Sequence, residues 1–475
     1  LYGDDLWESF RRLKTAFDPQ WLLNPGNVCG DTDPTENLRY DDDYEFEAGF
    51  EPTLNWDNDN GFQGMAELCH GCAGCEGHQD TTGGVMCPTY RATENEEITS
   101  TRGRANMLRR SMSGDLPDDV FDDEFIHEVL DLCIGCKGCK RDCPSGVDMA
   151  KLKTEVKHEH HQREGIPLRD KLFANVETLY SLGSTFAPLS NLATKLPGSN
   201  LLMEKTLGIA RERDLPTFKR GTLKKWARSR TPAVSEAEAD RKALLIADPY
   251  TNYTQPAVGK AAVRTLEAAG VFVEVSDAVT DSGRPAHSKG MVDAARETAT
   301  ANVDMLAPRV ADGWDIVSVE PSDAVMYQED YLDLLSGEAV EQVAGNTYSV
   351  MEYLDSFRLD EALETAAEET LSYHGHCHQT AAGREHHAVG ILRRAGYDVD
   401  VLDTTCCGMA GSFGYEAEHY SMSQAIGQML FDAADSSPAQ EIVAPGTSCR
   451  TQLADYEQQH GKPPHPIEKV AAALD

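Results

Sequence analysis

The stretch Cys133–Pro144 reads C-I-G-C-K-G-C-K-R-D-C-P and organises the whole chain. An earlier run has the same spacing in its first three cysteines, Cys69, Cys72 and Cys75, and is followed by Cys87 before Pro88. Three closely spaced thiolates can bind three irons of one cubane cluster, while the cysteine before a proline completes a second cluster. Two such runs therefore predict two [4Fe–4S] clusters.

The spacing assigns to each cluster three cysteines of one run and the last cysteine of the other run. The first cluster would be bound by Cys69, Cys72, Cys75 and Cys143. The second cluster would be bound by Cys133, Cys136, Cys139 and Cys87. Structural zinc is the alternative, but tetrahedral zinc sites are built from cysteine pairs, whereas these are triplets. Thiols in such dense runs cannot all reach disulfide geometry.

Composition limits the partners and the number of domains. A chain of 475 residues has room for about two to four domains with cores of their own. It carries 43 Lys and Arg against 79 Asp and Glu, and the formal net charge of -36 disfavours nucleic acid as a partner. The acidic residues are spread through every segment, which favours an extreme halophile as the source, with a moderately acidic mesophilic protein as the alternative.

The sequence also predicts a location in the cell. It contains no run of about 18 apolar residues, so no segment is expected to span a membrane. No signal peptide opens it, and thiols in cluster spacing favour a reducing cytoplasm. A peripheral contact with the inner face of the cell membrane stays compatible with both observations.

The pattern of the first 30 residues is typical of the C-terminal end of a domain. Apolar residues at Leu6, Phe10, Leu13 and Phe17 predict an amphipathic helix, and the turn L-N-P-G follows. This segment resembles the closing segment of the FAD-linked oxidase family, whose members oxidise 2-hydroxy acids such as D-lactate and glycolate. The resemblance implies a flavin domain upstream, with FAD as its cofactor. Residues 31–64 are acidic and aperiodic, and we expect a linker there.

Residues 65–165 are predicted to form a helical domain around the two cysteine runs. The long helical stretch between the runs resembles the helical ferredoxin domain of the iron–sulfur subunits of succinate dehydrogenase and glycerol-3-phosphate dehydrogenase. Arg102 and Arg104 are expected at a solvated helix start, with compensation of cluster charge as the alternative. Three histidines of the following helix are expected on a solvated face, namely His158, His160 and His161.

Residues 166–240 are predicted to be a helical connector. Its basic stretch 215–226, which ends in Trp226, could contact a membrane surface or the flavin domain, or pack on the cluster domain. From residue 241 the chain repeats itself at an offset of 126 residues, so that Gly270 corresponds to Gly396 and Asp323 to Cys449. Two α/β halves, 241–360 and 361–475, are therefore expected.

The second half carries four further cysteines, Cys377, Cys406, Cys407 and Cys449. Their motifs resemble the CCG family of heterodisulfide reductase, glycolate oxidase and glycerol-3-phosphate dehydrogenase subunits, which implies a third iron–sulfur cluster. Gln452 stands where longer family members have another cysteine, which favours a simple cluster, and zinc or thiol chemistry is the alternative. His374, His376 and His378 are expected either to tune the cluster or to serve packing.

The first half lacks thiols at the corresponding positions. The offset aligns Tyr250 with His376, Thr251 with Cys377, and the pair Thr280-Asp281 with the cysteine pair, and oxygen ligands are poor substitutes for thiolates. We therefore expect a degenerate, structural half. The predicted fold class is a multidomain α+β chain, in which a helical two-cluster ferredoxin domain precedes two repeated α/β halves of CCG type.

Together these resemblances imply the iron–sulfur, C-terminal half of an FAD-linked D-lactate dehydrogenase or glycolate-oxidase-like protein. Electrons from reduced FAD would pass through the clusters to a quinone or a cytochrome. The alternatives are a heterodisulfide-reductase-like or anaerobic glycerol-3-phosphate dehydrogenase iron–sulfur subunit, and a non-enzymatic ferredoxin-like carrier. Substrate-binding residues would lie in the upstream half, so no catalytic residue is assigned within this chain.

Overall fold

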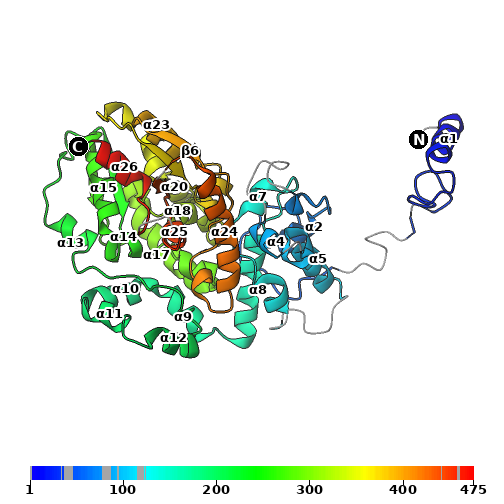
Figure 1. The fold of residues 1–475 in the computed structure, drawn as a ribbon, viewed down its shortest axis with the longest axis horizontal. Coiled ribbons are helices and arrows are strands. Elements are labelled where there is room, and N and C mark those ends of the chain that lie inside the picture. Colours follow the sequence, from blue (N-terminus) through cyan, green and yellow to red (C-terminus); the bar gives the residue numbers. More distant parts are fainter. Residues whose placement is uncertain are drawn as a thin grey trace.

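The structure is a computed structural model that describes residues 3–33, 35–36, 46–77, 87–93, 96–114, 122, 125–439, 441–456 and 461–474. Figure 1 shows a helical body beside a larger α/β body, with helix α1 (Asp4–Phe17) standing apart. The carboxylate of Asp18 ends this helix, because it accepts hydrogen bonds from the N–H groups of Leu22 and Leu23 at 3.0 and 2.9 Å. The predicted apolar face of α1 is exposed.

The expected linker over 31–64 packs against the rest of the protein from residue 46 onward, so that part of the expectation is wrong. The N–H groups of Thr53 and Leu54 donate to the carboxylate of Glu155 at 2.5 and 3.0 Å, and Leu54 is buried. The buried carboxylate of Glu155 needs these donors, which anchors the segment. Residues 34 and 37–45 of the linker lie outside the described residues.

The helical body is built around a core that includes Phe62, Leu108, Leu130 and Leu152. Its elements are α2 (Gly61–Glu67), η1 (Gly74–Glu76), α4 (Pro88–Ala92), η2 (Glu97–Thr99), α5 (Thr101–Met112), η3 (Ile126–Leu130), α7 (Gly138–Asp142) and α8 (Met149–Glu164). Side chains cap two of them: Ser100 accepts from the Gly103 N–H, and Asp148 accepts from the Lys151 N–H.

Helix α8 is covered on several faces. It packs against α2 and α5 and also against α17 (Val292–Ala311) of the α/β body. Its three histidines are therefore buried, and the expected solvated face is wrong for His158, His160 and His161. The spacing of polar residues along one helix does not reveal that a second body covers the polar face.

The connector wraps along one edge of the α/β body (Figure 1). Its helices are α9 (Leu168–Ala174), α10 (Val176–Thr185), α11 (Leu189–Ala193), α12 (Ser199–Leu207) and α13 (Leu223–Arg228). Trp226 is half-buried against the core shared by both sheets, and Arg230 and Lys260 lie over its ring at 5.0 and 5.5 Å. Around Trp226 the basic stretch thus packs on the α/β body, and not on the cluster domain as the packing alternative expected.

The first α/β half contains a parallel sheet of order β2-β1-β3-β4. Its strands are β1 (Arg241–Ile246), β2 (Val271–Val275), β3 (Trp314–Ser318) and β4 (Thr347–Ser349). Its remaining helices are α14 (Pro249–Tyr253), α15 (Pro256–Ala268), α16 (Arg284–Ser288), α18 (Pro321–Val325), η4 (Met326–Asp330), α19 (Tyr331–Leu334), α20 (Glu338–Gly345) and α21 (Val350–Ser356).

The second half contains a parallel sheet of order β6-β5-β7. Its strands are β5 (Thr370–Tyr373), β6 (Asp398–Val401) and β7 (Glu441–Val443). Its helices are η5 (Leu359–Ala362), α22 (Cys377–Ala381), α23 (His386–Arg394), η6 (Phe413–Tyr415), α24 (Tyr420–Ser436), α25 (Thr447–Leu453) and α26 (Pro466–Ala473). Leu245 of β1, Tyr373 of β5 and Val443 of β7 belong to one buried cluster, so the two halves share a core.

Candidate functional site

The two cysteine runs share an unusual backbone. Gly71 and Gly135, two residues after the first cysteine of each run, have φ of 78° and 64°. Ala73 and Lys137, directly after the second cysteine, have φ of 59° and 60°, a left-handed conformation that is uncommon for residues with a side chain. Such turns direct successive N–H groups into one concavity, an arrangement found at anion and iron–sulfur sites.

Contacts place the first run beside the end of the second. His70, next to Cys69, hydrogen-bonds through Nδ1 to Oγ of Ser145 at 2.6 Å, and Ser145 follows Cys143 by two residues. The N–H of Arg102 donates to Sγ of Cys75 at 3.4 Å. Burial raises the pKa of Cys75 to about 11, so without a positive group the thiol would keep its proton at neutral pH.

Contacts also place Cys87 beside the second run. Oγ1 of Thr89, two residues after Cys87, donates to the carbonyl of Leu132, directly before Cys133, at 2.9 Å. Burial raises the pKa values of Cys136 and Cys139 well above the usual range. Nη1 of Arg104 lies 3.7 Å from Sγ of Cys87, and its Nε donates to the carbonyl of Val129 at 2.9 Å. Buried thiols with raised pKa values need cations to become thiolates.

Arg104 departs from the sequence expectation. Its side chain is 1% exposed rather than solvated, so the charge-compensation alternative fits better than the favoured one. Its Nη2 is buried and has no hydrogen-bond partner among the described residues. A buried guanidinium with an unused donor beside cysteines is suited to an anionic group, and an iron–sulfur cluster in thiolate ligation carries negative charge. The residues present therefore fit the clusters that the spacing predicts.

The remaining four cysteines meet at the carboxyl ends of the second sheet's strands. Cys377 follows β5, the pair Cys406 and Cys407 follows β6, and Cys449 follows β7. Because parallel strands end at one edge of a sheet, the three loops converge there. All four side chains are buried and belong to one cluster.

Direct contacts join these thiols. The hydrogen bond with Cys377 raises the pKa of Cys406, and hydrogen bonds from Cys406 and Cys449 lower that of Cys407. A ring nitrogen of His374 and the Sγ atoms of Cys407 and Cys449 lie within 4.8 Å of one another. Thiolates and imidazole are ligands for iron–sulfur clusters and for zinc alike.

Two histidines of the H-G-H-C-H motif and Gln452 each have a hydrogen-bond partner of their own. Nδ1 of His374 hydrogen-bonds to Oγ1 of Thr404 at 2.8 Å, which orients the ring. Nδ1 of His376 accepts from the N–H of His378 and caps α22. Gln452 is buried, and its Oε1 accepts from Arg213 at 2.8 Å, so it is engaged away from the thiols.

The sheet register corrects one alignment of the two halves. Val275 and Val401 lie opposite Leu245 and Tyr373, respectively, so the first strands differ by 128 residues rather than 126. Pro249, not Thr251, therefore corresponds to Cys377, and Asp248, not Tyr250, corresponds to His376. Asp248 caps α14 as His376 caps α22. The misalignment arose because the segment from Leu245 to Gly270 is two residues longer than the corresponding segment from Tyr373 to Gly396.

Acidic side chains lie close together in the first half, which has no thiols at the positions that correspond to the cysteines of the second half. Burial raises the pKa of Asp248 to about 7, and burial together with the charges of Asp248 and Glu320 raises that of Asp323. Oγ of Ser282 donates to Asp323 at 2.6 Å. These side chains are held by local hydrogen bonds.

The second cysteine run contacts the loop that carries Cys377. Nε2 of His378 lies 3.0 Å from the carbonyl of Gly135, the neighbour of Cys136. Nη1 of Arg141 donates to the carbonyl of Thr380 at 2.6 Å, and α7 packs against α22. Cys136 itself packs against the cluster that contains Cys377. The two sets of thiols thus adjoin across the domain boundary.

Buried charges reinforce this boundary. Nζ of Lys137 lies 2.5 Å from Oδ1 of Asp330, and Nη1 of Arg284 lies 2.7 Å from its Oδ2. Although burial opposes it, the charge of Lys137 holds the pKa of Asp330 well below its usual range. Nε2 of His419 lies 3.0 Å from Asp131 and its Nδ1 lies 3.0 Å from Glu416, which raises the pKa of His419 against the effect of burial.

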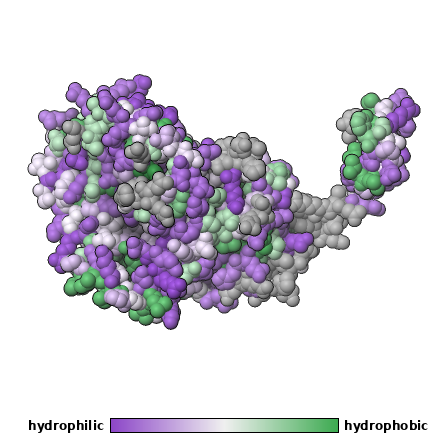
Figure 2. Space-filling model, viewed as in Figure 1, coloured by the Kyte–Doolittle hydropathy of each residue, from purple (hydrophilic) through white to green (hydrophobic). Residues whose placement is uncertain are grey.

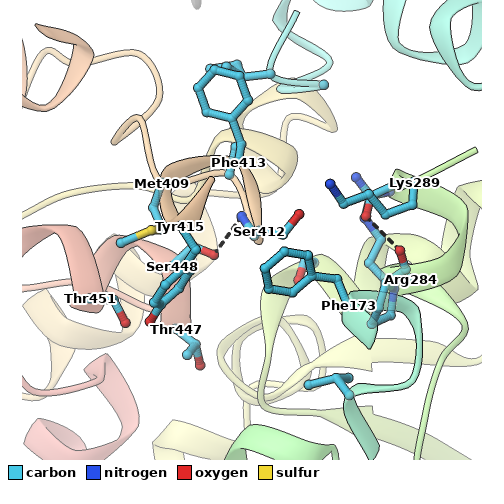
Figure 3. A pocket seen from close by; sticks show the side chains of 18 of the residues that line it. Phe173, Arg284, Lys289, Met409, Ser412, Phe413, Tyr415, Thr447, Ser448 and Thr451 are labelled. Carbon is cyan, nitrogen blue, oxygen red and sulfur yellow. Dashed lines mark hydrogen bonds between the residues drawn. The ribbon is translucent and has the colours of Figure 1, made fainter. Parts of the chain in front are cut away.

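A cavity of about 530 Å³ lies between the connector, the helical body and both α/β halves. Its lining includes Cys133, Cys377 and Cys449. Figure 3 shows Met409 and Tyr415 of the second half on one side, and Phe173 of the connector with Lys289 on the other. The cavity therefore reaches thiols of both sets.

Comparisons with known proteins agree with this organisation. Residues 65–147 match the model of the 4Fe-4S dicluster domain, residues 348–454 that of the cysteine-rich domain, and residues 1–28 that of the C-terminal domain of FAD linked oxidases. The chain is 27% identical to a D-2-hydroxyglutarate dehydrogenase of Escherichia coli over 99% of its own length and 49% of that protein. The chain thus spans about half the length of the first curated relatives it matches.

Shorter relatives match as well. One of the subunits of the anaerobic glycerol-3-phosphate dehydrogenase of Escherichia coli is 28% identical over 65% of this chain and 77% of its own length. The glycolate oxidase iron-sulfur subunit of Escherichia coli is 23% identical over 82% of this chain and 92% of its own length. The chain accordingly carries iron–sulfur electron-transfer domains, a 4Fe-4S dicluster domain and then a cysteine-rich domain, related to those of FAD-linked hydroxy acid dehydrogenases.

Proposed function

We propose that this chain is the electron-transfer portion of an FAD-linked dehydrogenase that oxidises a D-2-hydroxy acid. The similarity to D-2-hydroxyglutarate dehydrogenases makes D-2-hydroxyglutarate the first substrate to test, before D-lactate and glycolate. The flavin domain would precede residue 1, and the match of residues 1–28 to the end of FAD linked oxidases supports this. A quinone or a cytochrome is the proposed acceptor.

The ligand sets follow the cross-ligation rule in this proposal. Iron–sulfur clusters, when bound, take up and release single electrons. The contact of His70 with Ser145 supports a first set of Cys69, Cys72, Cys75 and Cys143. The hydrogen bond from Oγ1 of Thr89 to the carbonyl of Leu132 supports a second set of Cys133, Cys136, Cys139 and Cys87. Cys377, Cys406, Cys407 and Cys449, with His374 as a neighbour or ligand, form the third set.

The observation that carries the proposal is the contact between the second and third sets. Gly135 and His378 hydrogen-bond directly, and each is adjacent in sequence to a proposed ligand, Cys136 and Cys377. Lys137, Asp330 and Arg284 fix the same boundary with buried ion pairs. The residues of this chain would thus hold two redox sites next to one another.

The experiment is an assay of the polypeptide that includes the flavin domain, loaded with iron without oxygen. D-2-hydroxyglutarate, D-lactate, glycolate and glycerol 3-phosphate are offered with an artificial dye acceptor. We expect turnover with a 2-hydroxy acid. Cys136→Ser should abolish dye reduction while substrate still bleaches the flavin, and Cys29→Ser, outside any ligand spacing, should change neither. Turnover with glycerol 3-phosphate alone would contradict the proposal and favour the glycerol-3-phosphate dehydrogenase type.

A further inference from the structure

The connector exposes an unusual number of large apolar side chains. They lie on α10, α11 and α12 and in the turns between these helices: Leu179, Leu182, Phe186, Leu189, Leu192, Leu196, Leu201 and Leu202. Leu189 is 68% exposed and Leu202 63%. Figure 2 shows hydrophobic surface gathered along the lower edge of the molecule, over these helices. We call this set the connector face.

The connector face avoids charge in a chain that is otherwise rich in it. Residues 178–203 contain one charged side chain, Lys195, whereas 26% of the whole chain is charged. In this acidic protein, a face that contacts only water would carry acidic residues, as the remaining surface of the protein does. Contiguous exposed apolar surface of this kind marks an interaction site.

The helices are fastened so that this face points outward. The ring of Tyr180 packs edge-on against Phe218 and Tyr250, with ring centroids 5.2 and 5.6 Å apart. The side chain of Asn191 exchanges two hydrogen bonds with the backbone of Phe218, at 2.9 and 2.8 Å. Leu182, Leu189 and Leu192 are therefore held in exposed positions by partly buried contacts made elsewhere on α10 and α11.

The charge around the connector face is opposite to that of the chain. Residues 166–230 contain 12 Lys and Arg against five Asp and Glu, while the whole chain has a net charge of -36. The exposed cations include Lys171, Lys195, Lys205, Lys219 and Arg220, none of which forms an ion pair within the described part of the chain. An apolar face with unpaired lysines and arginines matches the interfacial region and headgroups of an anionic bilayer.

We propose that the connector face seats on an anionic lipid bilayer and holds the protein at a membrane surface. No helix in the described ranges combines the length and apolar composition needed to cross a bilayer, so the contact would be peripheral. The flavin domain is a less suitable occupant, because the chain enters the helical body at residue 46, beside α2 and α5. These helices lie toward the opposite end of the long axis from α10 and α11 (Figure 1).

The same helices form a wall of the cavity that reaches the cysteines. Leu172 and Met203 of the connector line it, Leu179 of the connector face also reaches it, and Cys377 lines it as well. If the proposed electron-transfer function holds, a lipid-soluble acceptor such as a quinone could approach the third set of thiols from the bilayer. The docking itself does not depend on that function.

The test is co-sedimentation of the iron-loaded full chain with vesicles of phosphatidylcholine and phosphatidylglycerol. We expect the wild-type protein to sediment with the vesicles. The double variant Leu189→Glu, Leu192→Glu should lower the partition coefficient at least about tenfold, because it places two carboxylates against lipid. Leu332→Glu is the matched control, an exposed leucine on α19 away from the connector, and should partition like the wild type.

Two further measurements separate the outcomes. Thermal melting and iron content of the double variant should equal those of the wild type, since both leucines are exposed and lie outside the cysteine sites. A wild-type protein that stays in the supernatant would overturn the proposal, as would an equal loss of binding in Leu332→Glu. Gel filtration that shows a dimer dissociated by Leu189→Glu would assign the connector face to a second copy of the chain instead.

Discussion

Replacing Arg104 by glutamine should lower the reduction potential of the cluster bound by Cys87. The guanidinium is buried and lies 3.7 Å from Sγ of Cys87. Its positive charge favours the reduced, more negative cluster, and glutamine keeps a similar length and a hydrogen-bond donor without the charge. Arg104→Lys is the matched control, because it retains the charge and loses the planar fork.

The magnitude follows from Coulomb's law. An added electron is spread over the cluster, so its mean distance from the guanidinium is taken as roughly 7 Å, which at an effective dielectric constant of about 20 corresponds to about 2.4 kcal/mol. For a one-electron couple this is about 100 mV. Arg104→Gln should therefore shift one cluster by on the order of 100 mV, and Arg104→Lys by much less.

The assay is a redox titration followed by electron paramagnetic resonance at low temperature. Only one reduced-cluster signal should move, and it should be the signal that disappears in Cys136→Ser, because Cys87 and Cys136 are proposed to bind the same cluster. A shift of the other ferredoxin signal would refute the cross-ligation. Potentials unchanged within a few tens of millivolts in Arg104→Gln would refute the electrostatic role of Arg104.

Three further predictions concern the thiols and the domain boundary. Cys136→Ser should remove one of two ferredoxin signals, since a hydroxyl is a poor replacement for a thiolate; two intact signals would contradict the ligand set. Iron analysis should give about 12 irons per chain. Cys406→Ala should lower this number by about four, while Asp323→Ala should leave it unchanged. A count of about eight irons that does not change in Cys406→Ala would indicate zinc or thiol chemistry at the third set of cysteines. Because its pKa is raised on folding, His419 should stabilise the fold fully below its unfolded pKa of about 6.5 and lose that contribution as pH rises through the folded value. Thermal melts at several pH values should show this loss, and His419→Gln should abolish it; an identical profile in the variant would contradict the role of its ion pair with Asp131.

Local spacing was sufficient to find the cysteine runs that lie in the matched dicluster and cysteine-rich domains, and the ligand set of each cluster stays a prediction. Ligand runs such as Cys69 to Cys75 are short-range patterns, and strands that end at one edge bring distant loops such as those of Cys377 and Cys449 together by a general rule. Such patterns did not predict the contacts between the helical body and the α/β body. The burial of His161 depends on α17, which lies far away in the sequence and packs against α8. The burial of Arg104 depends on the segments of Cys87 and Val129 elsewhere in the helical body.

The alignment of the halves shows a related limit. A constant offset described β2 with β6 and β3 with β7, but a length difference of two residues displaced Thr251 from its expected counterpart. Only the hydrogen-bonded register of the sheets reveals such a shift. The cavity and the connector face likewise arise from tertiary packing, although the near absence of charge between residues 178 and 203 was a signal that sequence analysis could have used.

The buried ion pairs of Lys137 also bear on how the protein denatures. Asp330 belongs to the first α/β half, whereas Lys137 lies within a ligand run of the helical body. Unfolding one body alone would remove one partner of this pair, and loss of one partner of a buried ion pair typically costs about 3–5 kcal/mol. The helical body and the two α/β halves should therefore melt as one cooperative unit, and removal of iron from the helical body should lower the melting temperature of the first α/β half, which lacks thiols.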